Sequence, residues 1–157
     1  MMRIVFVLAG GPLADLAFLR ERIDSVKPEA ILCADGGARY ARLLGLVPRA
    51  IVGDLDSLDG ETARFFADRG TRLVRHAPEK DETDTELALR EALALDPDAV
   101  WIFGGLGWRL DHTLANLSLL GYDPRRYHTG RAPFEAASMG VRLRHQQVAY
   151  RMNLVTL

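Results

Sequence analysis

Aspartates recur at one position of a repeating pattern in this sequence. Each follows an apolar run by a few residues, and together they are Asp35, Asp54, Asp56, Asp81, Asp84 and Asp111. If the apolar runs are parallel strands, their carboxyl ends meet at one edge of a sheet, where open α/β folds bind ligands. Carboxylates gathered there repel one another unless a cation neutralises them. Hard oxygen ligands suit Mg²⁺, which often binds together with substrate phosphates.

Each acidic motif also has a simpler explanation. Asp35 precedes two glycines and could belong to an ordinary turn. Asp54 and Asp56 lie two residues apart, so in an extended chain both carboxylates would point the same way and could meet one metal, although such pairs also arise by chance. Thr83 and Glu86 have the spacing of a helix-capping box. What favours a single ligand site is that all these acidic motifs follow predicted strands.

Glycine-rich and positively charged segments accompany the acids. Residues 104–107 (Gly-Gly-Leu-Gly) resemble a loop that cradles phosphate, and Arg109 carries a planar fork that can bind phosphate oxygens. Arg109 is equally compatible with an ordinary surface arginine, and His112 with a structural histidine. Lys80 supplies a further positive charge, and Trp108 is a candidate to flank a ligand.

The elements that must position these residues alternate between strand and helix. Apolar runs predict strands at residues 3–8, 30–34, 50–52, 71–74 and 99–103. Helical spacing predicts helices at residues 12–23, 38–44, 63–67, 83–95 and 111–120. Continuous apolar strands separated by helices indicate a parallel sheet that is covered on both faces. We therefore predict an α/β fold, a Rossmann-like three-layer sandwich with a mainly parallel sheet of about five or six strands.

The last part of the chain has a different character. Residues 121–157 contain six arginines and two carboxylates, for a net charge of +4, whereas residues 1–120 contain 14 basic and 19 acidic residues, for a net charge of −5. Residues 134–139 are compatible with a short helix, and residues 141–157 with one or two edge strands. We therefore predict an α/β domain at 1–120 and a separate tail at 121–157.

Composition narrows the class of protein. A length of 157 residues fits one domain, and 48% hydrophobic with 26% charged residues excludes a disordered chain. A net charge of −1 argues against nucleic-acid and membrane-surface partners. No apolar run approaches the roughly 18 residues of a membrane span, and the initial apolar stretch is too short for a signal peptide. Cys33 is the only cysteine, and we expect it, like Trp101, in the core; no disulfide is predicted, and a reducing cytoplasm is the expected location.

Segments of this chain together resemble the catalytic domain of the thiamine pyrophosphokinase family, in the family's order and at similar spacing. They are residues 34–38 (Ala-Asp-Gly-Gly-Ala), 53–57 (Gly-Asp-Leu-Asp-Ser), 80–84 (Lys-Asp-Glu-Thr-Asp) and 104–112 (Gly-Gly-Leu-Gly-Trp-Arg-Leu-Asp-His), the last continued by Leu114, Ala115 and Asn116. The resemblance covers roughly residues 1–120.

The resemblance implies an ATP:thiamine diphosphotransferase, which transfers pyrophosphate from ATP to the thiamine hydroxyl and releases AMP. It implies a set of catalytic aspartates, Asp35, Asp54, Asp56, Asp84 and Asp111. Among these, Asp54, Asp56 and Asp84 would hold Mg²⁺, with Asp35 close by. The implied nucleotide-binding positions are Lys80, Thr83, Gly104, Gly105, Arg109, His112 and Asn116. Family members are usually homodimers whose thiamine pocket is completed by a second, all-β domain.

This chemistry depends mainly on positioning and on neutralising charge. A carboxylate, either Asp111 or Asp35, would accept or orient the hydroxyl proton, and the sequence leaves both open. Two other activities also remain open. One is an ATP- and Mg²⁺-binding remnant without thiamine turnover, and the other is a metal-dependent phosphohydrolase, which also suits a strand that ends in paired aspartates. A purely structural protein gives no reason to gather acids at one sheet edge.

The resemblance to the family ends after Asn116. Only 37 residues follow Leu120, whereas a β-sandwich takes roughly 100 residues. We therefore expect the usual second domain to be absent or truncated, and residues 121–157 to be a divergent, truncated or frame-shifted tail. Resequencing the gene tests this expectation: an intact downstream frame that encodes β strands is the expected result, and its absence counts against it.

Overall fold

The structure is a computed structural model that describes residues 1–79, 82–107 and 109–119 together with three later strands. The first strands are β1 (Ile4–Leu8), β2 (Ala30–Ala34), β3 (Ala50–Gly53), β4 (Arg72–Arg75) and β5 (Ala99–Phe103). The helices are α1 (Leu16–Val26), α2 (Ala38–Leu43), α3 (Gly60–Ala67), α4 (Asp84–Leu93) and α5 (Leu110–Ser118), and a 3₁₀ turn (Asp35–Gly37) precedes α2. The later strands are β6 (Phe134–Ala137), β7 (Gly140–His145) and β8 (Val148–Asn153).

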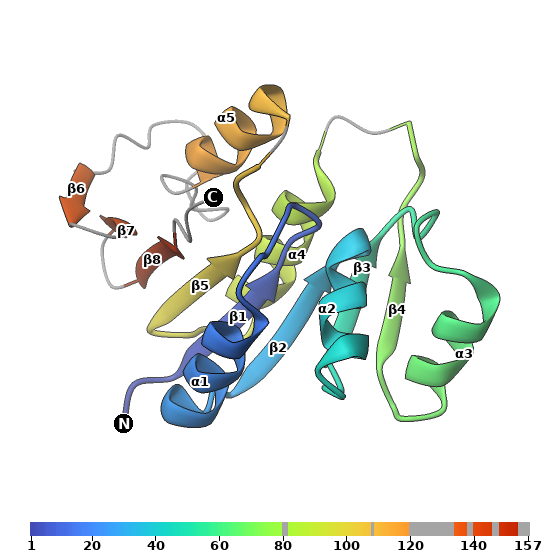
Figure 1. Ribbon diagram of the computed structural model, residues 1–157. Coiled ribbons are helices and arrows are strands. Elements are labelled where there is room, and N and C mark those ends of the chain that lie inside the picture. Colours follow the sequence, from blue (N-terminus) through green and yellow to red (C-terminus); the bar gives the residue numbers. More distant parts are fainter. Residues whose placement is uncertain (80–81, 108, 120–133, 138–139, 146–147, 154–157) are drawn as a thin grey trace.

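All the described strands join one sheet in the order β4-β3-β2-β1-β5-β8-β7-β6 (Figure 1). The strands from β4 to β5 in this order pair in parallel throughout. Strand β8 adds to β5 in parallel, while β7 and β6 follow in antiparallel pairing. The parallel sheet with helices confirms the predicted α/β class.

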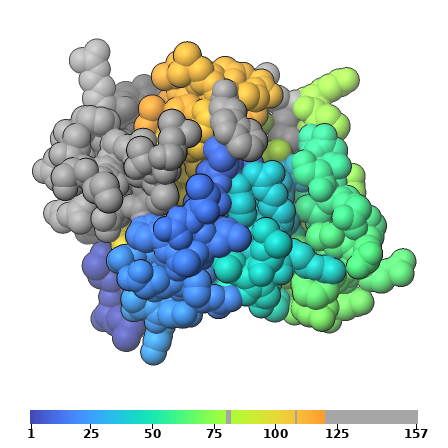
Figure 2. Space-filling view, in the orientation of Figure 1, coloured from blue at the N-terminus to red at the C-terminus, as the bar shows by residue number. Residues whose placement is uncertain are grey.

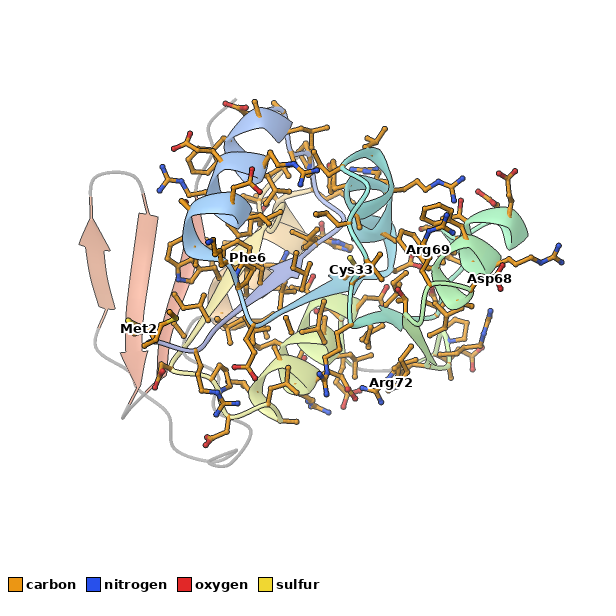
Figure 3. The ribbon with its side chains drawn as sticks, turned by 90° about the horizontal axis from the view of Figure 1, so that it is seen from below. Met2, Phe6, Cys33, Asp68, Arg69 and Arg72 are labelled. Carbon is orange, nitrogen blue, oxygen red and sulfur yellow. The ribbon has the colours of Figure 1, made fainter. Side chains whose placement is uncertain are left out.

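Alternate side chains of the central strand enter two separate cores. Val5 and Val7 pack in one cluster with Leu87, Ala88 and other buried residues of α4. Phe6 and Leu8 belong to a second cluster, whose helical members are Leu19, Ala38, Tyr40, Ala41 and Phe66 of α1, α2 and α3. Figure 3 shows Phe6 and Cys33 between the sheet and this helical layer. Strands β1, β2, β3 and β5 are apolar along their whole length, as expected where both faces of a sheet are covered.

The order of the strands creates a switch point at β1. The chain proceeds from β1 through β2 and β3 to β4 in one direction, and α1, α2 and α3 lie side by side on one face (Figures 1 and 2). It then returns through α4 on the opposite face and places β5 on the other side of β1. In open sheets, ligands bind outside the carboxyl ends of strands at such a point. This topology therefore decides where a site can form.

Helix boundaries follow side-chain caps. The side chain of Thr83 accepts a hydrogen bond from the backbone N–H of Glu86, as the predicted capping spacing requires. Helix α1 begins at Leu16 rather than at Pro12, because Asp15 caps it by accepting from Phe18 N at 2.8 Å. No helix among the described residues combines the length and apolarity needed to cross a bilayer.

The prediction of a short helix at residues 134–139 is wrong. Phe134–Ala137 is strand β6, which pairs with Gly140–His145, and residues 138–139 lie outside the described residues. A segment this short gains too few helical hydrogen bonds to offset the cost of nucleation, whereas pairing with a strand satisfies its backbone groups. Two strands do form within 141–157, β7 and β8, but neither is an edge strand as predicted, because β8 lies between β5 and β7, and β7 lies between β8 and β6. Residues 154–157 lie outside the described residues.

Gly37 packs directly on strand β1. A Cβ atom at this position would lie 1.9 Å from the carbonyl oxygen of Leu8. We expect Gly37→Ala to lower the free energy of unfolding by about 1–3 kcal/mol, the usual effect of overpacking. Gly60→Ala is the matched control, because a Cβ there meets nothing within 4 Å. The control should be neutral or stabilising by up to about 1 kcal/mol. Urea denaturation measures both variants, and equal midpoints would contradict the expectation.

Candidate functional site

A cavity of about 640 Å³ opens at the carboxyl edge of the sheet. Every segment that lines it follows a strand or begins a helix. These segments are the loop after β1 (10–12), the turn and helix after β2 (34–43), the loop after β3 (57–62), the start of α4 (83–85) and the loop after β5 with α5 (104–116). The cavity therefore extends from the switch point between β1 and β5 across β2 to the side of α3.

Acidic side chains converge at this edge. Asp35, Asp54 and Asp84 each offer a carboxylate oxygen, and these oxygens lie within 4.8 Å of one another. Asp35 is only 6% exposed, and the other two are half-buried. They come from three different elements: Asp35 follows β2, Asp54 follows β3, and Asp84 is the first residue of α4. The parallel sheet thus brings together residues that lie up to 49 positions apart in the sequence.

The backbone around this acidic cluster makes room for it. Gly53 has φ +148°, and a Cβ atom there would lie 2.8 Å from Asp84 Cγ and 3.0 Å from Asp35 Cβ. A larger residue at this position would push the carboxylates apart. Asp35 itself has φ +29°, which is uncommon for a residue other than glycine. Such backbone conformations concentrate at functional sites, where the surrounding structure maintains them.

Burial makes ionisation of Asp35 unfavourable. Loss of water raises the pKa of Asp35, and the neighbouring charges of Asp84, Asp54 and Asp56 act in the same direction. A hydrogen bond from the Ser57 hydroxyl opposes this effect. In the described part of the chain, Oδ1 of Asp35 is buried without a hydrogen-bond partner. Carboxylate oxygens converging at this distance, one of them unsatisfied, fit the ligand preference of a divalent cation such as Mg²⁺.

Asp56 lies outside the acidic cluster, contrary to the reasoning from the paired aspartates. That reasoning assumed an extended chain, but Leu55 has φ +62° and turns the backbone. As a result, the backbone N–H of Asp56 donates to Asp54 Oδ1 at 3.1 Å, and the exposed Asp56 side chain accepts from the Ser57 hydroxyl at 3.2 Å. The two carboxylates therefore do not point the same way.

Side chains of α5 hold the glycine-rich loop in place. Asn116 is buried, and its Nδ2 donates to the carbonyl oxygen of Gly105 at 2.7 Å. The backbone N–H of Gly107 donates to the Thr113 hydroxyl oxygen at 3.0 Å. The loop also joins the first loop, because Gly11 N donates to Gly104 O at 2.9 Å. These contacts assign Asn116 a role in shaping the cavity wall.

Arg109 and Asp111 pair with each other at the start of α5. Their side chains form two hydrogen bonds, at 2.6 and 3.2 Å, and both are exposed. The Arg109 guanidinium lowers the pKa of Asp111, with help from the backbone N–H of His112, and Asp111 raises the pKa of Arg109. Arg109 and His112 line the cavity. Asp111 is therefore an ionised partner that orients Arg109.

Helix α2 contributes residues that the sequence pattern did not reveal as functional. Arg39 and Arg42 both line the cavity, and Arg39 donates to the carbonyl oxygen of Gly10 at 2.9 Å. The hydroxyl of Tyr40 also donates to the carbonyl oxygen of Gly11. A signal was present, since two arginines three residues apart follow the Asp-Gly-Gly motif on the next helix turn. Their direction toward the cavity depends on how α2 packs, which the motif does not encode.

The predicted site residues therefore fall into three groups. Those that line the cavity are Asp35, Thr83, Asp84, Gly104, Gly105, Arg109, His112 and Asn116. Asp54 joins them through the acidic cluster, which does not include Asp56, and Asp111 pairs with Arg109 of the cavity wall. Lys80, Asp81 and Trp108 lie outside the described residues.

Comparison with known proteins identifies a family whose model matches most of the chain. The family described as "Thiamin pyrophosphokinase, catalytic domain" matches residues 25–128. Thiamine pyrophosphokinase of Bacillus subtilis is 34% identical over 119 residues, which cover 76% of this chain and 55% of that enzyme. The crystal structure of a thiamin pyrophosphokinase family protein from Enterococcus faecalis superposes with a TM-score of 0.62 at 32% identity, covering 90% of this chain and 64% of that chain.

A second family matches the end of the chain. The family described as 2,3-bisphosphoglycerate-independent phosphoglycerate mutase matches residues 105–157, so that the two matches overlap at 105–128. Phosphoglycerate mutase 2 of Methanothermobacter thermautotrophicus is 39% identical over 125 residues, which cover 80% of this chain and 24% of that enzyme. The chain thus spans about a quarter of this relative and about half of the Bacillus enzyme.

Asp35→Asn tests the acidic cluster directly. Folding raises the pKa of Asp35 above its value in the unfolded chain. The folded state therefore loses stability as the pH rises from the unfolded-state pKa through the folded-state pKa, because Asp35 must then ionise in an unfavourable environment. At neutral pH this loss is complete. Asparagine removes this charge and tolerates positive φ. Without divalent cation at pH 7.5, we expect the variant to melt about 2–4 °C higher than wild type, the shift that corresponds to about 1 kcal/mol.

Added Mg²⁺ should then raise the melting temperature of wild type but not of the variant, since binding stabilises only the state that binds. Differential scanning fluorimetry measures all four conditions. A variant that melts below wild type without cation, or that gains as much from Mg²⁺, would contradict this account.

Proposed function

The chain belongs to the thiamin pyrophosphokinase catalytic-domain family, and from this premise we propose that it transfers pyrophosphate from ATP to the hydroxyl of thiamine and releases AMP. One observation carries the proposal. Asp35, Asp54 and Asp84 converge at the edge of a cavity that glycine-rich loops and an arginine also line. This arrangement suits a polyphosphate bound with a cation, because the transferred group is strongly anionic and its reaction depends on charge neutralisation.

We propose that Mg²⁺ is the cation of this site. Asp35, Asp54 and Asp84 would hold it, with Asp56 beside them as a further acidic group. When bound, Mg²⁺ would neutralise charge on the phosphate oxygens of ATP. The protein's own contribution is to keep these carboxylates together, which the glycine at position 53 permits.

The remaining cavity residues position the substrates. Arg109 presents its guanidinium from the start of α5, where Asp111 holds it, and Gly104 and Gly105 let the backbone approach a phosphate closely. Of the two carboxylates proposed to accept or orient the hydroxyl proton, Asp35 lines the cavity, while Asp111 is engaged by Arg109. We therefore propose that Asp35, rather than Asp111, accepts or orients the hydroxyl proton of thiamine. Lys80 and Thr83 complete the proposed nucleotide-binding set.

We further propose that residues 121–157 are a divergent tail, distinct from the α/β domain at 1–120. The change in family match within 105–128 and the change in net charge near residue 120 support this division. We also propose that the protein forms a homodimer, as members of the family usually do. We place the protein in the cytoplasm, with ATP and thiamine as its partners and without nucleic acid or membrane.

A second candidate function is an ATP- and Mg²⁺-binding protein without thiamine turnover. The observation that favours it is the end of the family match at residue 128, beyond which residues up to 157 match another family. A metal-dependent phosphohydrolase is a third candidate, because the acidic cluster alone would also serve hydrolysis.

The proposed activity is tested by the product. Purified full-length protein given ATP, thiamine and Mg²⁺ should form AMP, and Asp54→Asn should reduce the rate by about 100-fold or more, because it removes a charged group from the acidic cluster. Coupled detection of AMP measures this. If wild type forms no more AMP than Asp54→Asn, the proposed activity is wrong.

The alternatives give different results in the same samples. Release of ADP or phosphate without an acceptor alcohol would identify the phosphohydrolase. Calorimetry with ATP·Mg²⁺ and with thiamine, each alone, would identify the binding protein if ATP binds while thiamine neither binds nor reacts.

A further inference from the structure

Arg90 joins two carboxylates on either side of the start of α4. Its Nη1 donates to Glu82 Oε1 at 2.9 Å, and its Nη2 donates to Glu86 Oε1 at 2.8 Å. The exposed fractions of the side chains are 31% for Arg90, 31% for Glu82 and 16% for Glu86, so the group is partly shielded from water. A planar fork with two donors suits this double contact, whereas the single ammonium of lysine does not.

The residues enclosed by this clamp belong to the site. Between Glu82 and Glu86 lie Thr83, which caps the helix through Glu86 N at 3.1 Å, and Asp84, which is in the acidic cluster. The cap and the Glu86 contact fix the helix itself. The Glu82 contact reaches further back, to the residue before the cap. Arg90 therefore connects the second turn of α4 to the chain that leads into it.

We propose that Arg90 is a positioning residue for the cation site: by holding Glu82 against α4, it fixes the segment 82–84 and so keeps the Asp84 carboxylate within the acidic cluster. This inference rests on the proposed function, which places a divalent cation there. Arg90 acts through Glu82 and the backbone, and it is not assigned a contact with substrate.

The charges near the helix start explain why such a clamp is needed. Glu82, Asp84 and Glu86 place negative charges close together in the sequence, and the acidic cluster adds two more. Without Arg90, Glu82 and Glu86 would repel each other, and the preceding segment would move away from the helix.

The chain offers a matched control in another arginine that pairs with a glutamate of α4. Arg72 of β4 pairs with Glu91, which lies in the last turn of α4, away from the segment before it. Figure 3 labels Arg72, which lies on β4, the strand at one edge of the sheet. Arg72→Gln removes an arginine–glutamate pair of α4 just as Arg90→Gln does, but it leaves the connection to Glu82 intact.

The test is a double-mutant cycle read by Mn²⁺ binding to the full chain, followed by the loss of the free-ion electron paramagnetic resonance signal. Arg90→Gln and Glu82→Gln should each raise the dissociation constant about three- to tenfold, below the usual effect of buried groups around metal ligands because this pair is partly exposed. The double variant should be no weaker than either single variant. Arg72→Gln should match wild type, and all variants should keep the wild-type circular dichroism spectrum. In the turnover assay, Arg90→Gln should raise the Mg²⁺ concentration that gives half-maximal rate by the same three- to tenfold factor. Its kcat should stay within about twofold of the wild-type kcat.

Several outcomes would overturn the inference. Equal Mn²⁺ affinity of Arg90→Gln and wild type would do so, as would weakening by Arg90→Gln without weakening by Glu82→Gln, which would show that Arg90 acts only on helix stability. Absence of Mn²⁺ binding to wild type would refute the cation site and this inference with it. Mn²⁺ binding that behaves as expected in a protein that forms no AMP would instead leave the positioning role intact and count against the transferase.

Discussion

Mutual repulsion of carboxylates at the edge of a parallel sheet is the constraint on which the rest of this structure depends. Asp35, Asp54 and Asp84 lie within 4.8 Å of one another, and burial raises the pKa of Asp35. Such an arrangement persists only if the surrounding fold is rigid enough to maintain it. Apolar cores on both faces of the sheet provide that rigidity, because strands buried on both faces cannot shift without losing packing on each side.

The residues around the acidic cluster each help to fix the position of one neighbouring segment. Gly53 leaves room for two aspartates, and the Thr83 cap fixes the start of α4. Asn116 holds the glycine-rich loop on the other side of the cavity. The cavity is thus formed by loops that are attached to the core at their ends, a common way to place reactive groups on a rigid scaffold. A cation is the natural complement, because it turns repulsion among the carboxylates into attraction.

The chain matches the models of two families. The matches overlap at residues 105–128, which include α5, the last helix of the thiamin pyrophosphokinase-like part. The strands that follow extend the sheet from β5, so that side of the parallel sheet is covered by backbone pairing. Pairing of this kind depends on main-chain groups and not on a particular side-chain sequence.

The sequence by itself determined the fold class, all five predicted parallel strands to within one residue at each end, and the edge at which the aspartates gather, because hydrophobic periodicity can be recognised within each segment of the chain. Tertiary structure decided which aspartates meet. Asp56 was expected beside Asp54, yet the positive φ of Leu55 turns it away, and Asp35 from a neighbouring strand takes its place. The sequence pattern also did not predict that Arg39 contacts Gly10 at the cavity or that Arg90 contacts Glu82. A spacing rule assumes a regular backbone, whereas a site is formed where the backbone departs from regularity and distant segments pack against each other.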